Sequence, residues 1–258
     1  MNSIKIYQDT PDVAGTGFNN CDSHTNGEFA LLPHLIKSSD VVFDIGANRG
    51  QWSRQALSVN KSIRLHSFEP SVNVFVGLKN NLAGTNTSLH NIAISDGNGQ
   101  ETFYQYNSCP TLSSLYRRSS VIEKRLHLSF VSTLVQTCTL DSFCENHSIS
   151  HVDFVKIDTE GSELDVLRGA INLLREHKIK IVQFEYGGTY PDAGITLREV
   201  CELLSLHKYV IFRILSDGIV HIAQWHNSLE NSKYSNYLAV SSEKAGSYKV
   251  MTNLLAEN

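Results

Sequence analysis

Residues 41–50 read VVFDIGANRG, and this stretch decides the fold. A run of β-branched and aromatic residues that ends at a glycine is typical of a short strand buried on both faces of a sheet. Asp44 lies near the end of the run, and Gly46 and Gly50 follow with three residues between them. A glycine turn directly after the first strand of an open α/β sheet lies at the edge where such sheets bind nucleotide-like cofactors.

Strand-like and helix-like segments alternate after this turn. Apolar residues at helical spacing predict a helix at 72–82, between the apolar runs at 63–69 and 89–94. Further helices are expected at 162–176 and 196–206. Seven strands are expected outside one insertion, at residues 41–45, 63–69, 89–94, 151–157, 180–184, 209–215 and 237–240. This alternation implies right-handed crossovers. The sequence therefore predicts an α/β, Rossmann-like fold with a seven-stranded, mostly parallel sheet and helices on both faces.

Two segments do not follow the alternation. Residues 1–26 show no sustained periodicity and are expected to form an N-terminal arm, while residues 27–258 are expected to form a single domain. The insertion at about 100–140 predicts a hairpin and a helical cap. It is either a solvated surface segment or a lid that shapes an acceptor pocket.

Composition narrows the classes of partner. The chain has 22 Lys and Arg against 26 Asp and Glu, a formal charge of −4, so no nucleic-acid partner is expected. Its five cysteines contain no C-x-x-C pair, which argues against a disulfide framework or a zinc site and favours the cytoplasm. No segment approaches the roughly 20 apolar residues of a membrane span. Oligomeric state is not readable from the sequence.

The glycine turn does not have the pattern of a phosphate-binding loop. The Walker pattern is absent, and the dinucleotide fingerprint lacks its middle glycine. An acidic residue, Glu69, ends the next strand, where a carboxylate accepts hydrogen bonds from a ribose diol. An acidic residue with a permissive turn suits S-adenosylmethionine, which has a ribose but no phosphate.

Four stretches of the chain resemble the FkbM-type S-adenosylmethionine-dependent methyltransferases. They are VFDIGANRG (42–50), SFEP (67–70), NIAISD (91–96), and VKIDTEGSE (155–163) followed by VLRGA (166–170). The last block is the most specific to the family. The resemblance implies the class I methyltransferase fold and methyl transfer, usually to a hydroxyl of a sugar or secondary metabolite.

The resemblance also implies roles for individual residues around the cofactor. Glu69 is expected at the ribose diol, and Asn91 and Asp96 are expected near adenine. The methionine and ribose end is expected to lie against the first motif, at Asp44, Gly46, Asn48 and Gly50.

The catalytic candidates follow the fourth and fifth strands. Asp158 and Glu185 end neighbouring strands, so their carboxylates are expected to converge beside the methyl group. Asp158 is the expected general base, since methyl transfer requires that the acceptor oxygen be positioned and its proton removed. Glu185 shares this work, holds a hydroxyl of the acceptor, or joins Asp158 around a divalent cation. The cation is not favoured, and no metal ligand is assigned.

Glu160 and Glu163 lie near the first turn of the following helix. Negative charge there complements the helix dipole, so a structural role is at least as well supported as a role in the site.

The expected function is therefore transfer of a methyl group from S-adenosylmethionine to a hydroxyl of a saccharide or of a glycosylated or secondary metabolite. Two alternatives stay open. An NAD-dependent oxidoreductase would share the sheet and the ribose carboxylate, and a binding protein without turnover would share the whole cofactor site.

Overall fold

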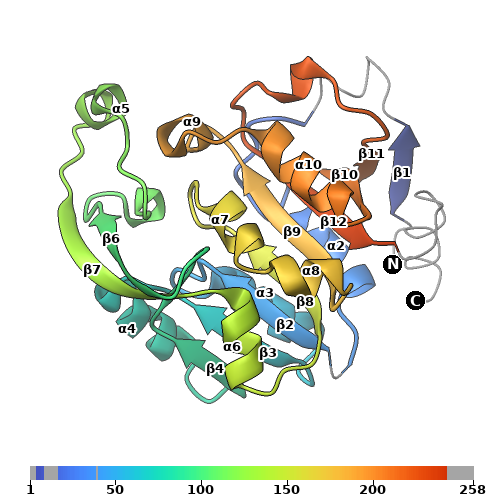
Figure 1. Ribbon diagram of the computed structural model, residues 1–258, viewed down its shortest axis with the longest axis horizontal. Helices are drawn as coiled ribbons and strands as arrows, with labels where there is room; N and C mark the ends of the chain where they lie inside the picture. The colour runs from blue at the N-terminus through green and yellow to red at the C-terminus, as the bar shows by residue number, and fades with distance from the viewer. Residues whose placement is uncertain (1–3, 9–16, 39, 243–258) are drawn as a thin grey trace.

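The computed structural model describes residues 4–8, 17–38 and 40–242 (Figure 1). The strands of the main sheet are β1 (Lys5–Gln8), β2 (Val41–Ile45), β3 (Arg64–Phe68), β4 (Thr87–His90), β8 (Val152–Ile157), β9 (Ile179–Tyr186), β10 (Tyr209–Leu215), β11 (Gly218–His221) and β12 (Ser235–Ser241). Within the described residues they form one nine-stranded sheet in the order β1-β11-β10-β12-β9-β8-β2-β3-β4.

The order of the central strands identifies the fold class. The strands β4, β3, β2, β8 and β9 run parallel to one another, and β12 is inserted antiparallel between β9 and β10. This is the arrangement of a class I methyltransferase sheet, so the predicted fold class is confirmed. Two strands, β11 and β1, extend the sheet beyond the seven that were predicted.

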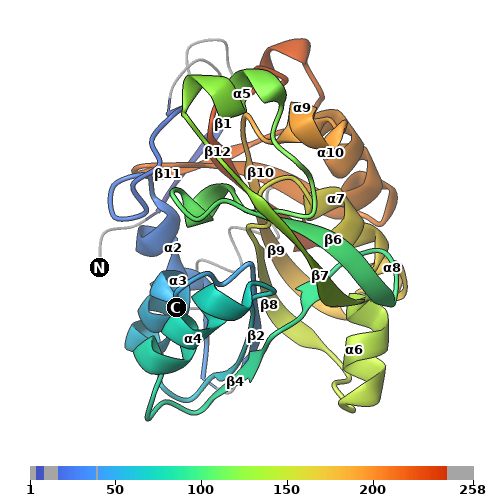
Figure 2. The same ribbon diagram turned by 90° about the vertical axis from the view of Figure 1, so that its left-hand side faces the viewer.

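Helices cover both faces of the sheet (Figures 1 and 2). One face packs against α2 (Glu28–Leu35), α3 (Gln51–Val59) and α4 (Val72–Asn81), and the other against α6 (Leu140–Asn146), α7 (Glu163–Arg168), α8 (Ile171–Arg175) and α10 (Leu197–Leu206). Successive side chains of a strand point to opposite faces. In β2, Val42 therefore packs in the core beneath α2, α3 and α4, and Phe43 packs in the core beneath α6, α7, α8 and α10. Both side chains are fully buried.

The structure corrects three details of the sequence interpretation. The strand expected at 89–94 is divided between β4 and β5 (Ala93–Ile94), which belong to different sheets. The helix expected at 162–176 is interrupted at Gly169, where a Cβ atom would lie 2.1 Å from the carbonyl oxygen of Ser95. Part of the expected arm forms β1, because Lys5–Gln8 pairs in parallel with β11.

The insertion forms the predicted hairpin and cap. Strands β6 (Gly99–Gln105) and β7 (Val131–Cys138) pair antiparallel, and β5 joins them in a three-stranded sheet. Between β6 and β7 lie η1 (Pro110–Leu112) and α5 (Ser120–Arg125). Two further short helices are α9 (Tyr190–Ala193) and η2 (Asn227–Leu229). Among the described residues no helix is long and apolar enough to cross a membrane.

Candidate active site

The turn after β2 is packed against the ends of two neighbouring strands. The amides of Gly46 and Ala47 donate to the carbonyl oxygen of Phe68 at the end of β3, at 3.1 and 2.9 Å. Gly46 has φ 81°, and a Cβ atom there would lie 1.8 Å from the carbonyl oxygen of Asp158. Only glycine satisfies both the backbone conformation and this close approach. The turn therefore brings the ends of β2, β3 and β8 together.

Glu69 follows β3 and faces a small cavity of about 110 Å³. Its Oε2 accepts the amide of Asn48 at 3.0 Å, and its Oε1 accepts the amide of Ser71 at 2.8 Å. Burial raises the pKa of Glu69 to about 7, and the charges of Asp44 and Asp158 add to the effect. A carboxylate oxygen accepts more than one hydrogen bond, so both oxygens retain capacity for a pair of ligand hydroxyls.

Much of the remaining wall of this small cavity is apolar, although Ser71, Thr111 and Ser113 also line it. The apolar residues come from α4, from β5 and from the insertion: Val74, Ala93, Ile94, Phe103 and Leu115. An apolar slot beside a carboxylate that can accept further hydrogen bonds has the chemistry of an adenosine site. Sequence reasoning missed these walls, although the alternation in β6 that turns Phe103 inward, 4% exposed, is a signal that was available.

The predicted cofactor residues divide into two groups. Gly46, Asn48 and Glu69 line the small cavity. The other four do not line it: Asp44, Gly50, Asn91 and Asp96.

Two residues of the second group support the cavity from behind. Asp44 is fully buried, and its Oδ2 accepts the hydroxyl of Ser53 at 2.6 Å. The side-chain amide of Asn91 donates to the carbonyl oxygens of Glu69 and Pro70 at 2.8 and 3.0 Å. Gly50, with φ 81°, is the N-cap of α3, and Asp96 is exposed.

A second cavity of about 850 Å³ adjoins the first. Five residues line both: Gly46, Asn48, Thr111, Asp158 and Glu160. Glu28, Lys156 and Glu185 line the large cavity on the side of the sheet, and residues of the cap close it from the other side. Asp158 thus lies where the two cavities join.

Three carboxylates meet at this junction. Asp158, Glu160 and Glu185 each place an oxygen within 4.8 Å of the other two. Burial raises the pKa of Glu160 to about 8 and that of Glu185 above its usual value, and repulsion from Asp158 adds to both shifts. Lys156 donates to Oδ2 of Asp158 at 2.7 Å and supplies positive charge. The structure therefore brings both predicted catalytic residues together and adds Glu160, for which the sequence argument left a structural role and a site role open.

The loop that carries Glu160 is held by Glu163. The two carboxylate oxygens of Glu163 accept the amides of Thr159 and Gly161, at 2.8 and 3.0 Å. Burial raises the pKa of Glu163 to about 7. Glu160 itself has φ 59°, in the left-handed region that costs a non-glycine residue roughly 1 kcal/mol. The pair Glu160-Gly161 is the sequence signal for such a turn.

Comparison with known proteins shows that the chain is similar to proteins described as methyltransferases. The family described as Methyltransferase FkbM domain matches residues 44–211. The 2-O-methyltransferase NoeI of Sinorhizobium fredii is 26% identical over 188 residues, which are 70% of this chain and 77% of NoeI. The hexuronic acid methyltransferase AglP of Haloferax volcanii is 26% identical over 181 residues, 69% of this chain and 66% of AglP. The solved structure of a precorrin-6y C5,15-methyltransferase from Geobacter metallireducens has a TM-score of 0.45 and 13% identity, covering 83% of this chain and 88% of that chain.

Proposed function

The chain belongs to the FkbM methyltransferase family, and from that premise we propose that it methylates a hydroxyl oxygen of a saccharide or of a glycosylated or secondary metabolite, with S-adenosylmethionine as the methyl donor. The observation that carries this proposal is the position of Asp158, at the junction of an adenosine-like cavity and a larger cavity. The names of NoeI and AglP, a 2-O-methyltransferase and a hexuronic acid methyltransferase, support the choice of a sugar hydroxyl.

The residues of the small cavity fit S-adenosylmethionine. Glu69 provides the acceptor for the ribose hydroxyls, the apolar slot takes the adenine, and Gly46 and Asn48, which line both cavities, take the methionine end. When bound, this cofactor supplies a methyl group on a sulfonium, which is already a good leaving group. The chain's own residues then have two tasks, which are to orient the acceptor oxygen and to take its proton.

We assign the proton to the carboxylate cluster. The hydroxyl of an acceptor in the large cavity would donate to Asp158, which orients the acceptor oxygen and takes its proton, while S-adenosylmethionine, when bound, would supply the methyl group. Lys156 holds Asp158 in place at 2.7 Å. The raised pKa of Glu185 makes this neighbour a suitable final site for the proton, because a buried carboxyl group is stabilised in its neutral form.

A divalent cation at Asp158, Glu160 and Glu185 is the second candidate and is not favoured. The geometry of the three oxygens suits a hard cation. However, Lys156 already provides the positive charge that a metal would supply at Asp158. Turnover is therefore expected to be unchanged by EDTA, and loss of activity that Mg²⁺ restores would favour the cation.

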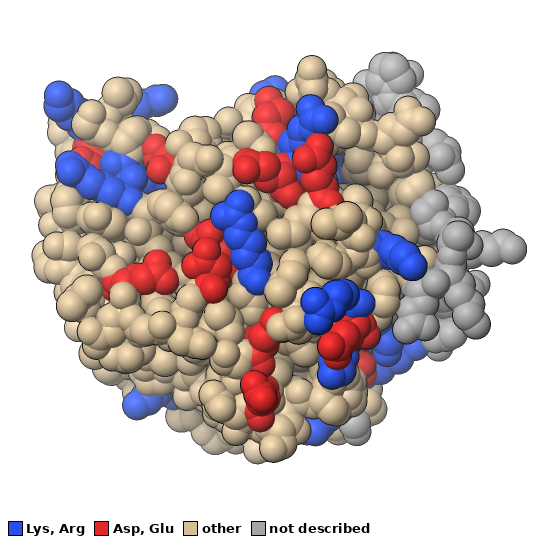
Figure 3. Space-filling view, viewed as in Figure 1, with Lys and Arg blue, Asp and Glu red and all other residues tan. Residues whose placement is uncertain are grey.

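Charge supports a saccharide over a nucleic acid as the acceptor. The formal charge of the chain is −4. Figure 3 shows acidic and basic side chains interspersed on this face, with basic ones gathered at the end where α5 lies. Phosphate backbones are usually bound by extended basic surfaces. A cytoplasmic site of action also belongs to the proposal, since all five cysteines are free thiols.

The direct test is a methyl-transfer assay with deuterated S-adenosylmethionine. A neutral methyl hexoside, a methyl hexuronide and a short RNA are offered in parallel, and S-adenosylhomocysteine release is measured with the mass of each acceptor. We expect a mass gain in at least one glycoside, located on oxygen by NMR, and none in RNA. Transfer to RNA alone, or tight S-adenosylhomocysteine binding with no glycoside methylated, would overturn the proposed acceptor class.

A further inference from the structure

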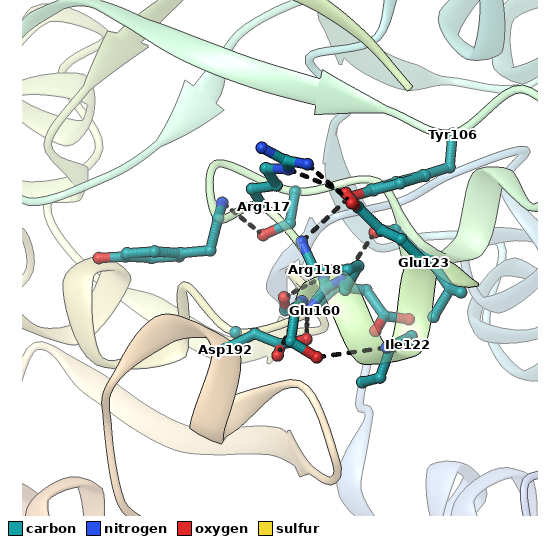
Figure 4. Close-up of polar contacts among 12 residues, drawn as sticks. Tyr106, Arg117, Arg118, Ile122, Glu123, Glu160 and Asp192 are labelled. Carbon is teal, nitrogen blue, oxygen red and sulfur yellow. Dashed lines mark hydrogen bonds and ion pairs between the residues drawn. The ribbon is translucent and has the colours of Figure 1, made fainter. Parts of the chain in front are cut away.

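Arg118 is a fully buried arginine in the middle of the insertion. Its side chain is 1% exposed, although residues on either side of it face solvent. Its backbone amide donates to the hydroxyl of Tyr106 at 3.0 Å, and its Nε donates to the carbonyl oxygen of Leu112 at 2.9 Å. Figure 4 shows the guanidinium between the cap and the loops of the main sheet.

The far side of the guanidinium contacts the loops that follow β8 and β9. Nη2 donates to the carbonyl oxygen of Glu160 at 2.6 Å, and Nη1 lies 3.7 Å from Oδ2 of Asp192 in α9. The side chain of Asp192 is 5% exposed, and its Oδ1 accepts the amide of Ser119 at 3.1 Å. One side chain therefore joins the cap, the Glu160 loop and α9.

The Glu160 loop depends on the insertion for its backbone partners. The hydroxyl of Ser114 donates to the carbonyl oxygen of Thr159 at 3.2 Å, next to the bond from Arg118 to Glu160. On the other side, the carboxylate of Glu163 accepts the amides of Thr159 and Gly161. Because Glu160 has left-handed backbone geometry, its peptide requires external hydrogen bonds to keep that conformation.

We propose that Arg118 is a positioning residue for methyl transfer, which holds the cap against the Glu160 loop so that the carboxylate of Glu160 stays beside Asp158 and Glu185. The inference rests on the proposed function of the same site. Arg118 acts through the loop and requires no bond to the acceptor. Its planar fork donates to two carbonyl oxygens in fixed directions and forms an ion pair with Asp192, whereas a lysine ammonium on a flexible stem does not reproduce that geometry.

The neighbouring arginine provides a matched control. Arg117 lies in the same segment, but its side chain is 51% exposed and its ion pair with Glu123, at 2.8 Å, stays within the insertion. Arg117→Lys therefore makes the same chemical change without touching the Glu160 loop. Asp192→Asn is a second variant on the opposite side of the contact, and it leaves the cap sequence unchanged.

The experiment measures loop exchange and turnover separately. Hydrogen exchange of the peptide 157–163 is followed by mass spectrometry in the wild type, Arg118→Lys, Asp192→Asn and Arg117→Lys. S-adenosylhomocysteine affinity is measured by calorimetry, and kcat and KM are measured with whichever methyl glycoside the wild type methylates. We expect Arg118→Lys to exchange at least about tenfold faster in this peptide. Its kcat is expected to fall about 10- to 100-fold, since a displacement of 1 Å costs about that much.

The same variant is expected to keep its S-adenosylhomocysteine affinity and acceptor KM within about threefold of the wild type. Asp192→Asn should show the same changes to a smaller extent, and Arg117→Lys should show none. Unchanged exchange in 157–163 in both test variants refutes the proposal, and so does a fall in cofactor affinity that parallels the fall in kcat. If no glycoside is methylated by the wild type, the proposed function fails, while the exchange data still decide whether Arg118 positions the loop.

Discussion

Replacing Glu69 by glutamine should weaken S-adenosylhomocysteine binding and remove most of its dependence on pH. Both carboxylate oxygens of Glu69 accept backbone amides, at 3.0 and 2.8 Å, and the group is 6% exposed. A glutamine turns an NH₂ group toward one of these donors and loses the charge that strengthens the bonds to the ribose. Hydrogen bonds to a charged group contribute about 1.5–3 kcal/mol, which corresponds to an affinity loss of roughly 10- to 100-fold.

The pH dependence follows from the same carboxyl group. Its pKa in the free protein is about 7, and the ligand hydroxyls favour the ionised form. The ionised fraction is about 90% at pH 8 and about 10% at pH 6. The Kd of the wild type should therefore rise about tenfold from pH 8 to pH 6, which corresponds to about 1.4 kcal/mol of binding free energy. In Glu69→Gln the change over the same range should be less than about threefold, with the remainder reporting on Glu160 and Glu163.

Calorimetric titration with S-adenosylhomocysteine at pH 6 and pH 8 measures both effects. Glu202→Gln is the control, because this exposed carboxylate pairs only with Arg198 on the surface of α10 among the contacts recorded for it. The Kd of the control variant should match that of the wild type at pH 6 and at pH 8. A wild-type Kd that stays constant between pH 6 and pH 8, or a Glu69→Gln variant with unaltered affinity, would refute the assignment of Glu69 to the ribose.

Three further predictions concern catalysis, backbone geometry and stability. Asp158→Asn should lower kcat by about 10²- to 10⁴-fold in the methyl-transfer assay, with S-adenosylhomocysteine affinity within about threefold of wild type; retained turnover would exclude Asp158 as the base. Gly46→Ala should lower the free energy of unfolding, measured in urea, by more than about 3 kcal/mol. Gly84 also has a positive φ, but no atom lies within 4 Å of the Cβ that an alanine would add, so Gly84→Ala should lower the free energy of unfolding by only about 1 kcal/mol. Equal losses in the two variants would contradict the argument from close approach. Burial and neighbouring histidines lower the pKa of His66 and His90 to about 4, so the unfolded chain binds more protons than the folded chain between pH 6.5 and pH 4. The free energy of unfolding should therefore fall as the pH drops through this range, and it should fall less in His66→Gln. A free energy of unfolding that does not change over this range would show that these rings do not titrate on unfolding.

The sequence was sufficient to predict the sheet and part of the site. Short apolar runs that end at Gly46 and Glu69 have a local signature, and parallel crossovers follow from their alternation with helices. Strands β1 and β11 were missed because each has only four residues, and the edge strand β1 pairs with a segment more than 200 positions away. Local periodicity contains no information about such a pairing.

The insertion and the Glu160 loop were less predictable for a different reason. The adenosine-like slot depends on side chains such as Phe103 and Leu115, which enter it only because β5, β6 and β7 fold back over the main sheet. Glu160 has a helix-dipole explanation that is adequate until its left-handed turn and its neighbours are seen. In both cases the function of a residue is fixed by contacts between distant segments.

The insertion has an implication for protein engineering. Its first part, up to Leu115, supplies walls of the small cavity, whereas its later part, including Arg118, Ile122 and Leu126, faces only the large one. Exchanging residues 119–130 between relatives should therefore alter which acceptor is used without disturbing the methyl donor. Exchanging the whole insertion would alter both together, so evolution toward a new acceptor has a short, modular segment in which to work.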